Sequence, residues 1–375
     1  MNILVDGRPF SASSAGISTV LRCVLMSWST VCPENTFFVV LPKKMVDSMN
    51  DVVFPPNVIF LEAKLGLFKY LPNLAFLFLM VPVYIKKYKI DTYFSPVPCL
   101  PYFIPQKVRT IVIINDVVNL EFKDTMVWTN RLANALLFNR SVKSADIIWA
   151  ISDYTRGRVE YYFPKRKCRD IFVGCSTDRS LFRKLDLKAD EINIIKDKHG
   201  IKNKFVLFVG SLEPRKNLPF LLSIITPLYE KYGIQLVVVG ARGWKNSSIN
   251  EIVESDSFVK ESTLFCGFIS NQELVELYNI ADCFVSSSLN EGFGLPQLEA
   301  FLCGCPVVTA SNSAMVEVTA GKDGGKLVEG YDKDKWIDVS HEMVEKKPNV
   351  NLEQFNKFDW NKITKDLNER VIKDN

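Results

Sequence analysis

The residues best suited to chemistry lie in one run, Asn290–Ala300, which combines two acidic side chains with two glycines. Gly292 and Gly294 carry no Cβ, so a ligand can approach the backbone there. Pro296 suits the first turn of a helix, where its missing N–H costs nothing. The uncovered amides of that turn and the helix dipole favour a bound anion such as a diphosphate. The run therefore predicts an anion site at the start of a helix.

Two glutamates frame this site. Glu291 precedes the glycines and is expected to be free to reach a sugar hydroxyl. Glu299 lies one turn into the expected helix, where its carboxylate can accept hydrogen bonds from a ribose. Phe293 and Leu295 belong to the same expected donor-binding surface. The plainer alternative is a tight strand-to-helix turn that carries two surface glutamates.

A second candidate segment, Gly210–Leu218, contains the adjacent cations Arg215 and Lys216. Asn217 follows them and can cap a helix. Two cations beside a helix N-terminus are electrostatically unfavourable unless an anion lies there. We therefore interpret the pair as partners of a bound diphosphate, although two solvated charges at a helix start are the alternative.

The elements that must position these residues alternate between strand and helix signals, and the pattern occurs twice. Such alternation predicts two parallel-sheet domains, each binding ligands beyond the carboxyl ends of its strands. In the first half the expected strands are Ile3–Val5, Thr36–Leu41, Val108–Ile114, Asp146–Ile151 and Asp170–Val173, with helices at Asn130–Val142 and Thr155–Tyr162. In the second half they are Phe205–Val209, Gln235–Val239, Leu264–Cys266, Cys283–Ser286 and Pro306–Thr309, with helices after Asn217, after the Ser270–Glu273 capping box and at Leu295–Cys303.

The length of 375 residues also favours two domains, because it exceeds what one core usually serves. Residues Ser176–Lys204 are polar and charged and form the expected linker. The predicted domains are 1–185 and 186–355, two Rossmann-like units that face an interdomain cleft.

Composition excludes several classes of protein. Apolar residues make up 47% of the chain and the net charge is only +4, without the clustered basic face that nucleic-acid binding needs. The nine cysteines are scattered apart from Cys303 and Cys305, so neither a zinc site nor a disulfide framework is expected. The triplet Asp332–Asp334 is interpreted as a solvated loop and not as a metal site. The N-terminus lacks a signal peptide pattern, which favours a cytoplasmic protein.

Residues 65–89 form an apolar stretch flanked by lysines. The stretch is too short, and too interrupted by Pro72 and Pro82, for a spanning helix. Such a segment can instead dip into an anionic membrane interface, here through Phe76 and Phe78. A buried helix in a large domain explains the stretch equally well.

The Glu291–Glu299 spacing resembles the Glu-x7-Glu motif of retaining family-4 glycosyltransferases, the group 1 glycosyl transferases. The resemblance covers most of the chain and is strongest after Lys204. It implies a GT-B fold, a diphosphate neutralised by Arg215 and Lys216, and a C-terminal helix at 356–375 that packs back on the N-terminal domain. The family's donor-binding positions correspond to Gly16, Ser211, Gly267, Ile269, Gly292, Phe293, Gly294, Leu295 and Glu299.

The resemblance further implies metal-independent transfer of a hexosyl unit with retained configuration, from a nucleotide-diphosphate sugar and without any cofactor. The expected acceptor is a saccharide, lipid-linked, in bacterial surface polysaccharide (O-antigen) synthesis at the cytoplasmic face of the inner membrane. Nothing in the sequence identifies the base, the sugar or the linkage.

One departure from the family lies at Asn115–Asp116, where relatives have His-Asp and the histidine contacts the donor sugar. An asparagine amide can exchange hydrogen bonds but cannot carry a proton. Asp116 is then a candidate contact to the acceptor, and an Asx turn is the structural alternative. The departure leaves open a catalytically impaired sugar-nucleotide-binding or scaffold protein, while a nucleotide-sugar epimerase is disfavoured by the Arg215 and Glu291 segments.

Overall fold

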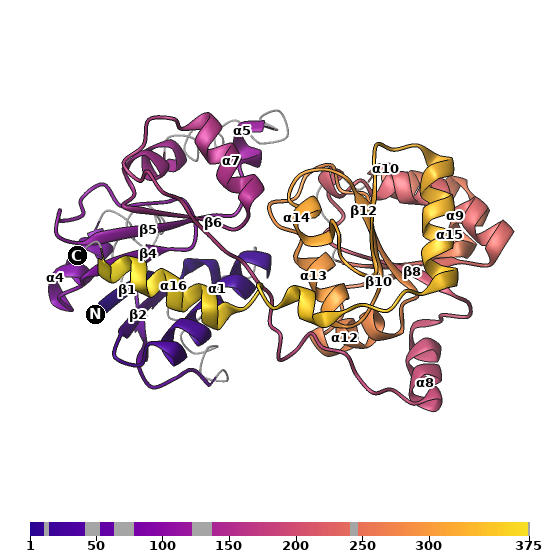
Figure 1. Ribbon diagram of the computed structural model, residues 1–375, viewed down its shortest axis with the longest axis horizontal. Helices are drawn as coiled ribbons and strands as arrows, with labels where there is room; N and C mark the ends of the chain where they lie inside the picture. The colour runs from indigo at the N-terminus through magenta and orange to yellow at the C-terminus, as the bar shows by residue number, and fades with distance from the viewer. Residues whose placement is uncertain (11–14, 42–52, 64–78, 122–136, 241–246, 374–375) are drawn as a thin grey trace. The chain divides into compact units, whose positions relative to one another are not determined.

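The computed structural model describes residues 1–10, 15–41, 53–63, 79–121, 137–240 and 247–373. The chain forms two compact units (Figure 1). Unit 1 comprises Met1–Ser176 together with Phe358–Asn375, and unit 2 comprises Thr177–Lys357. The division thus falls after Ser176, whereas the sequence pattern put it after residue 185.

Unit 1 contains a seven-stranded parallel sheet in the order β3-β2-β1-β4-β5-β6-β7. The strand order reverses between β1 and β4, so the connections leave this point in opposite directions. The strands are β1 (Asn2–Asp6), β2 (Thr36–Leu41), β3 (Val58–Glu62), β4 (Thr92–Ser95), β5 (Arg109–Ile114), β6 (Ile147–Ala150) and β7 (Phe172–Val173). The helices are η1 (Arg8–Phe10), α1 (Ala15–Val31), α4 (Val81–Lys87), α5 (Val118–Glu121), α7 (Asp153–Tyr162) and α16 (Trp360–Lys373).

The C-terminal helix α16 lies along α1 in unit 1 (Figure 1). The Trp28 indole N–H donates to Asn368 Oδ1 at 3.1 Å, and Asn35 Nδ2 donates to the same oxygen at 2.8 Å. Trp360 packs edge-on against Trp149 of β6, with ring centroids 6.2 Å apart. These buried polar and aromatic contacts make the last helix part of the first unit's core.

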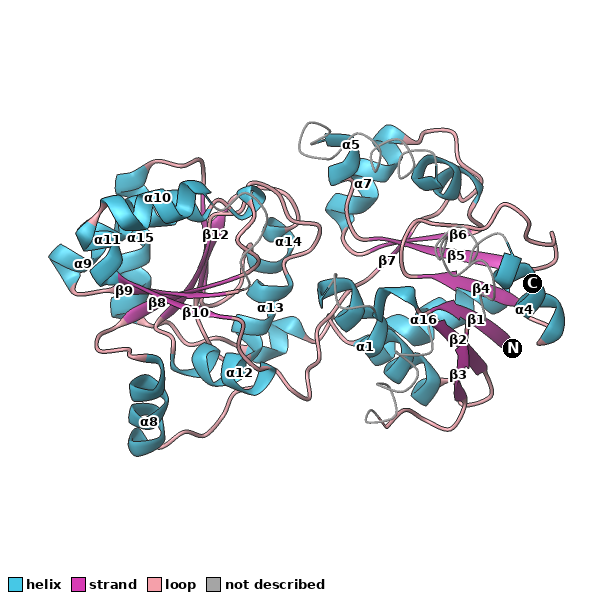
Figure 2. Cartoon of the chain, turned by 180° about the vertical axis from the view of Figure 1, so that it is seen from behind, coloured by secondary structure: helices cyan, strands magenta, loops and turns pink. Residues whose placement is uncertain are grey.

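Unit 2 contains a six-stranded parallel sheet in the order β10-β9-β8-β11-β12-β13. Helices α9 and α15 lie on one face of the sheet, and α12 and α13 on the other (Figure 2). The strands are β8 (Phe205–Val209), β9 (Gln235–Val239), β10 (Thr263–Gly267), β11 (Cys283–Ser286), β12 (Val307–Ala310) and β13 (Gly325–Val328). The helices are α8 (Ala189–His199), η5 (Pro214–Lys216), α9 (Leu218–Tyr232), α10 (Ser247–Ser255), α11 (Ser257–Ser262), α12 (Asn271–Ile280), α13 (Leu295–Leu302), α14 (Met315–Thr319), α15 (Lys333–Lys346) and η6 (Leu352–Phe355).

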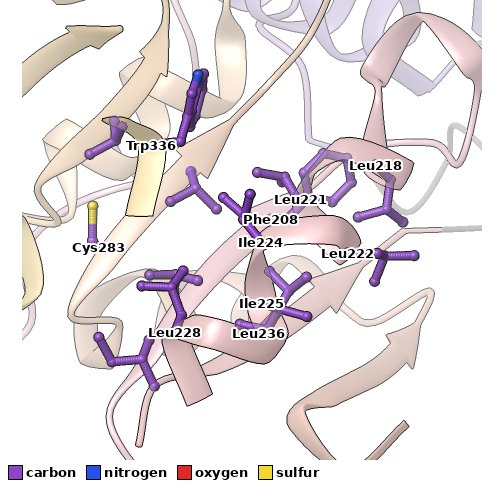
Figure 3. Close-up of a cluster of buried hydrophobic side chains, with 14 of the residues drawn as sticks. Phe208, Leu218, Leu221, Leu222, Ile224, Ile225, Leu228, Leu236, Cys283 and Trp336 are labelled. Carbon is purple, nitrogen blue, oxygen red and sulfur yellow. The ribbon is translucent and has the colours of Figure 1, made fainter. Parts of the chain in front are cut away.

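The core of unit 2 lies between α9, α15 and the sheet (Figure 3). Leu221, Ile225 and Leu228 repeat at helical spacing on α9 and are buried against Phe208 of β8. Each such side chain contributes roughly 1.5–3 kcal/mol when it leaves water. Trp336 of α15 is fully buried in the same cluster and fixes the second helix on this face.

Several local predictions need correction. The expected linker contains a helix, α8, whose C-cap Gly200 has a left-handed φ of 70°. Asn217 precedes α9 with a φ of 53°, but its side chain makes no capping hydrogen bond. The triplet Asp332–Asp334 is not a loop throughout: Asp332 is the N-cap of α15, with its carboxylate accepting from Lys335 N at 2.9 Å, and the helix begins at Lys333. The Ser270–Glu273 capping box is confirmed.

Two predicted segments lie largely outside the described residues. Of the expected helix Asn130–Val142, residues 137–144 are helical and the earlier part is not described. Of the apolar stretch 65–89, residues 64–78, including Phe76 and Phe78, are not described, and α4 follows at Val81–Lys87. Within the described ranges, no helix has the length and apolar character needed to cross a bilayer.

Candidate active site

The candidate site of unit 2 lies where the strand order reverses. Strands β8 and β11 are neighbours, yet β8 continues to β9 on one side and β11 continues to β12 on the other. Ligands of open parallel sheets bind outside the carboxyl ends of two such strands. The loops at those ends carry Arg215 and Lys216 after β8, and Glu291 after β11.

Glu291 joins the two loops through its carboxylate. Lys216 Nζ donates to Glu291 Oε1 at 2.6 Å, and Arg215 Nη1 donates to Oε2 at 2.8 Å. Ser288 Oγ donates to Oε1 at 2.7 Å. Arg215 Nη1 also donates to the carbonyl of Asn290 at 2.6 Å. The site is therefore a hydrogen-bonded triad of two cations and one anion.

The triad is largely removed from water, since Glu291 is 8% exposed and Lys216 is 9% exposed. Burial of the Glu291 carboxylate would raise its pKa. The charges of Lys216 and Arg215, with the hydrogen bonds from Lys216 and Ser288, oppose that effect and lower the pKa to about 2. Glu291 is thus ionised at any physiological pH.

The geometry of the triad corrects the expectation that Glu291 is free, and it removes the electrostatic argument that Arg215 and Lys216 need an external anion. Glu291 is not free but paired with both cations. Arg215 and Lys216 do not require an external anion, because Glu291 supplies one within the chain. Sequence reasoning missed this pairing because the three residues lie on loops that become neighbours only through the strand order.

The start of α13 is prepared as predicted. Gly294 is its N-cap with a φ of 104°. This left-handed conformation is unfavourable for a residue with a side chain. Pro296 lies in the first turn. The residue at the N-cap offers no side-chain hydrogen bond to the helix amides. These amides and the helix dipole can therefore interact with an anion. Phe293 is buried, and Gly292 and Leu295 are half-buried.

Glu299 occupies a second buried position, on α13. Thr177 Oγ1 donates to Glu299 Oε1 at 3.1 Å, and the Tyr278 hydroxyl donates to Oε2 at 3.2 Å. Burial raises the pKa of Glu299 to about 7, and the two hydrogen bonds only partly oppose that rise. The two glutamates of one motif therefore have pKa values displaced in opposite directions, a pattern that often accompanies different roles.

The carboxyl ends of β8, β9 and β10 meet through glycines. Gly240 N donates to the carbonyl of Gly267 at 2.8 Å, and Gly210 N donates to that of Val239 at 2.9 Å. A Cβ on Gly240 would lie 1.9 Å from the Gly210 carbonyl oxygen, so only glycine fits there. The predicted donor positions Ser211, Gly267 and Ile269 lie in the chain segments that leave this edge; Gly267 is exposed, and Ser211 and Ile269 are half-buried.

The other predicted site residues lie in unit 1. Asn115 follows β5, and its amide donates to the carbonyl of Pro96 at 3.2 Å. Asp116 beside it is half-buried. Gly16 is not in a turn but in the first turn of α1, where it is exposed.

Unit 1 also carries a buried ion pair that the sequence reasoning did not identify. Arg8 Nε donates to Asp6 Oδ1 at 2.9 Å and Nη2 donates to Oδ2 at 2.6 Å, at the carboxyl end of β1. Burial of the Arg8 guanidinium lowers its pKa, but the Asp6 carboxylate more than offsets this, so the pKa lies above its ordinary value. Thr177, Tyr278, Ser288 and Ser313 were missed as well, because their partners are set by tertiary structure. The described residues contain no group of three His, Cys, Asp or Glu side chains placed to hold a metal.

Comparisons with known sequences find relatives among glycosyl transferases. Residues 191–357 match the family described as Glycosyl transferases group 1. The serotype-specific mannosyltransferase WbdA of Escherichia coli is 28% identical over 226 residues, which cover 57% of this chain and 27% of WbdA. The O-antigen chain mannosyltransferase B of Escherichia coli is 28% identical over 260 residues, covering 67% of this chain and 64% of that protein. The chain therefore aligns with about a quarter of the first relative and under two thirds of the second.

Solved structures extend the likeness to the whole chain. Sucrose-phosphate synthase from Thermosynechococcus elongatus has a TM-score of 0.75 at 16% identity, covering 99% of this chain and 98% of that one. Anabaena HepE in complex with UDP-glucose also has a TM-score of 0.75 at 16% identity, and both chains are covered fully, at 100%. The chain thus has the GT-B fold of two parallel-sheet domains, and its residues 191–357 match the Glycosyl transferases group 1 family.

Proposed function

We propose that this protein is a glycosyltransferase that moves a hexosyl unit from a nucleotide-diphosphate sugar to a saccharide, with retention of configuration and without a metal. The observation that carries the proposal is the buried Arg215–Lys216–Glu291 triad at the strand-order reversal of unit 2, beside the start of α13. The solved structure of HepE is a complex with UDP-glucose, which supports a nucleotide sugar as the donor here. The mannosyltransferase names of the relatives make mannosyl donors the first to test.

The residues divide the proposed reaction between them. Lys216 and Arg215, with the amides at the start of α13, stabilise the negative charge that develops on the leaving diphosphate. Glu291 orients the donor sugar through one of its hydroxyls, and Glu299 contacts the ribose. The acceptor hydroxyl attacks from the face that the diphosphate leaves, so the C–O bond to the acceptor forms as the C–O bond to the diphosphate breaks. The acceptor proton leaves with the diphosphate.

The proposal is tested by removing one cation at a time. Arg215→Ala and Lys216→Ala are each expected to lower kcat by at least ~100-fold, since losing one oxyanion donor costs about 3–4 kcal/mol of barrier. Lys204→Ala is the matched control, because Lys204 forms an exposed pair with Glu345 in the same unit. Release of nucleotide diphosphate with a panel of sugar nucleotides measures the rate. Wild-type rates in both variants would refute the assignment.

We propose that the acceptor is lipid-linked and that the protein works at the cytoplasmic face of the inner membrane. A groove of about 810 Å³ on unit 1 supports this, because it combines Lys86, Lys89 and Lys107 with apolar side chains. Phe103 beside them is 72% exposed. Basic and aromatic side chains together favour an anionic bilayer surface.

Co-sedimentation with vesicles tests the membrane contact. The double variant Lys86→Glu/Lys107→Glu is expected to lose binding to phosphatidylglycerol-containing vesicles, whereas Lys143→Glu, an exposed control in unit 1, retains it. Equal binding by wild type to vesicles of phosphatidylcholine alone would contradict the electrostatic basis.

A catalytically impaired sugar-nucleotide-binding protein is the second candidate, favoured by Asn115. The Asn115 amide donates to the carbonyl of Pro96. The position of the family histidine therefore holds a neutral side chain that cannot carry a proton. Asn115→His distinguishes the two candidates. Donor turnover that arises only in this variant would support the impaired protein, and turnover in the wild type would exclude it.

A further inference from the structure

Unit 2 has three described non-glycine residues with left-handed backbone, and two of them border the triad. Asn217 (φ 53°) directly follows Lys216, and Ser313 (φ 49°) lies in the turn between β12 and α14. The third, Lys347 (φ 37°), ends α15, where such a conformation is ordinary. The left-handed conformation is unfavourable for serine, so a serine adopts it only where the surrounding structure imposes it.

Ser313 is held by contacts to the backbone of Glu291. Glu291 N donates to Ser313 Oγ at 3.0 Å, and Ala314 N donates to the carbonyl of Glu291 at 3.3 Å. Ser313 Oγ in turn donates to Asn312 Oδ1 at 2.9 Å. The peptide groups on both sides of the Glu291 Cα are therefore fixed by one turn.

The same turn reaches Ser288, the third donor to the Glu291 carboxylate. Asn312 Nδ2 donates to the Ser288 carbonyl at 3.1 Å, and the Tyr331 hydroxyl donates to the same oxygen at 3.0 Å. Ser288 Oγ then donates to Glu291 Oε1. The 312–314 turn thus fixes both the backbone of Glu291 and a side chain that orients its carboxylate.

We infer that Ser313 is a positioning residue that sets where the Glu291 carboxylate lies, and through it which hexose the donor site accepts. The inference rests on the proposed function in assigning Glu291 to the donor sugar. A carboxylate discriminates between hexoses only if it meets one hydroxyl at hydrogen-bond distance. A displacement of about 1 Å is enough to lower a rate roughly 100-fold.

Two substitutions separate positioning from structural support. Ser313→Ala removes the hydroxyl and keeps a side chain in the left-handed conformation, whereas Ser313→Gly removes the hydroxyl and relieves the conformation. A structural role makes activity follow stability, so the glycine variant would be the more active. A positioning role makes both variants lose kcat/KM equally, although the glycine variant is the more stable.

The measured quantity is kcat/KM for a pair of donors that carry the same nucleotide and whose sugars differ in the configuration of one hydroxyl. Suitable pairs are GDP-mannose with GDP-glucose, and UDP-glucose with UDP-galactose. Both variants are expected to lose about 10- to 100-fold in kcat/KM for the preferred donor. The ratio of kcat/KM between the two donors is expected to fall about 10-fold. Lys347→Gly, which relieves the same backbone conformation away from the site, is expected to change neither quantity. Unchanged preference in both Ser313 variants, or a loss confined to Ser313→Ala, would overturn the inference.

A second measurement holds even if no donor is turned over. Hydrogen exchange of the Glu291 amide reports directly on its hydrogen bond to Ser313, because that N–H donates to Ser313 Oγ. Its exchange is expected to accelerate at least about 10-fold in both variants while the β11 amides keep wild-type rates. An unchanged Glu291 amide would show that Ser313 does not hold it. An inactive wild type with an accelerated amide would instead count against the proposed function alone.

Discussion

The clearest test of the site concerns Glu299, which unit 2 holds in a position that disfavours its charge. Glu299→Gln replaces a buried carboxyl group by a neutral amide of the same shape. The amide can still accept from Thr177 and exchange a hydrogen bond with Tyr278, which now contact the two carboxylate oxygens. The substitution therefore removes the ionisable group and little else.

The size of the effect follows from the pKa displacement. Burial raises the folded-state pKa of Glu299 to about 7, compared with an ordinary glutamate value near 4.5. Below pH ~4.5 the group is neutral in both the folded and unfolded states and contributes nothing. As pH rises from about 4.5 to about 7, Glu299 ionises in the unfolded state while it stays neutral in the folded state, so the free energy of unfolding falls. The full loss corresponds to about 3 kcal/mol, since each pKa unit is worth about 1.4 kcal/mol.

Glu299→Gln should therefore stabilise unit 2 at about pH 8 and much less at about pH 5, with a difference of roughly 2–3 kcal/mol between the two conditions. Native-state hydrogen exchange of the β11 and β12 amides measures this free energy for unit 2 alone. Each variant is compared with wild type at the same pH, which cancels the intrinsic exchange rate. The exposed Glu254→Gln serves as the control for the chemical change itself.

A stability difference between Glu299→Gln and wild type that is equal at the two pH values would refute the reasoning. It would mean that Glu299 does not titrate between the ordinary glutamate value and neutrality. A difference that grows toward acid pH would have the wrong sign and would indicate a carboxylate stabilised by its surroundings.

Three further predictions follow from other parts of the structure. Removal of divalent cations with EDTA should leave turnover unchanged, because the proposed mechanism assigns the positive charge at the diphosphate to Arg215 and Lys216; a loss restored by Mg²⁺ would contradict this. Gly240→Ala should cost about 4 kcal/mol or prevent folding, measured by chemical denaturation, because its Cβ would lie 1.9 Å from a carbonyl oxygen. Gly157→Ala, a helical position with open space, should be neutral or stabilising by up to about 1 kcal/mol. Asn368→Ala should lower the free energy of opening of unit 1 by about 1–3 kcal/mol in hydrogen exchange, because the buried Trp28 N–H loses its acceptor.

Much of the fold could be predicted from the sequence, wherever a buried apolar run and the turn residues that bound it indicate the same element. Strands β2, β8, β9 and β11 have the predicted bounds, because each is a short apolar run. β4 was missed although all four of its residues are buried, since Thr92 and Ser95 break the apolar pattern. β3 was missed because its residues are mostly half-exposed and its position depends on pairing with β2.

The site was predictable only as far as its local chemistry. The Gly294 turn and the start of α13 follow from residues within one segment, and the structure contains them as expected. The contact of Thr177 with Glu299 joins residues 122 positions apart. The pairing of Glu291 with Lys216 spans 75 positions. No local periodicity encodes such distances, because they depend on which strands become neighbours in the sheet.

The pairing of Glu291 with both cations changes how the site must work, and Glu291→Gln tests the change. Two cations and one carboxylate leave one net positive charge, which is less than a nucleotide diphosphate needs, so in the proposed complex the amides of α13 would have to supply the rest. In the proposed complex the buried Glu291 carboxylate would also repel the diphosphate. Its neutral replacement should therefore bind free UDP or GDP more tightly, by about 10-fold, because a repulsion of a few kcal/mol is only partly screened.

The same substitution should lower kcat with the sugar nucleotide by at least about 10-fold, because the amide no longer accepts from the sugar as a carboxylate does. It should also destabilise unit 2 at neutral pH, since the pKa of Glu291 lies near 2 and its ionised form stabilises the fold above pH ~4.5. That contribution is lost as pH falls toward 2. Calorimetric titration separates the alternatives. Weaker binding of the free nucleotide in Glu291→Gln would mean that the carboxylate holds the cations in place for the diphosphate, and competition between the two anions would be excluded.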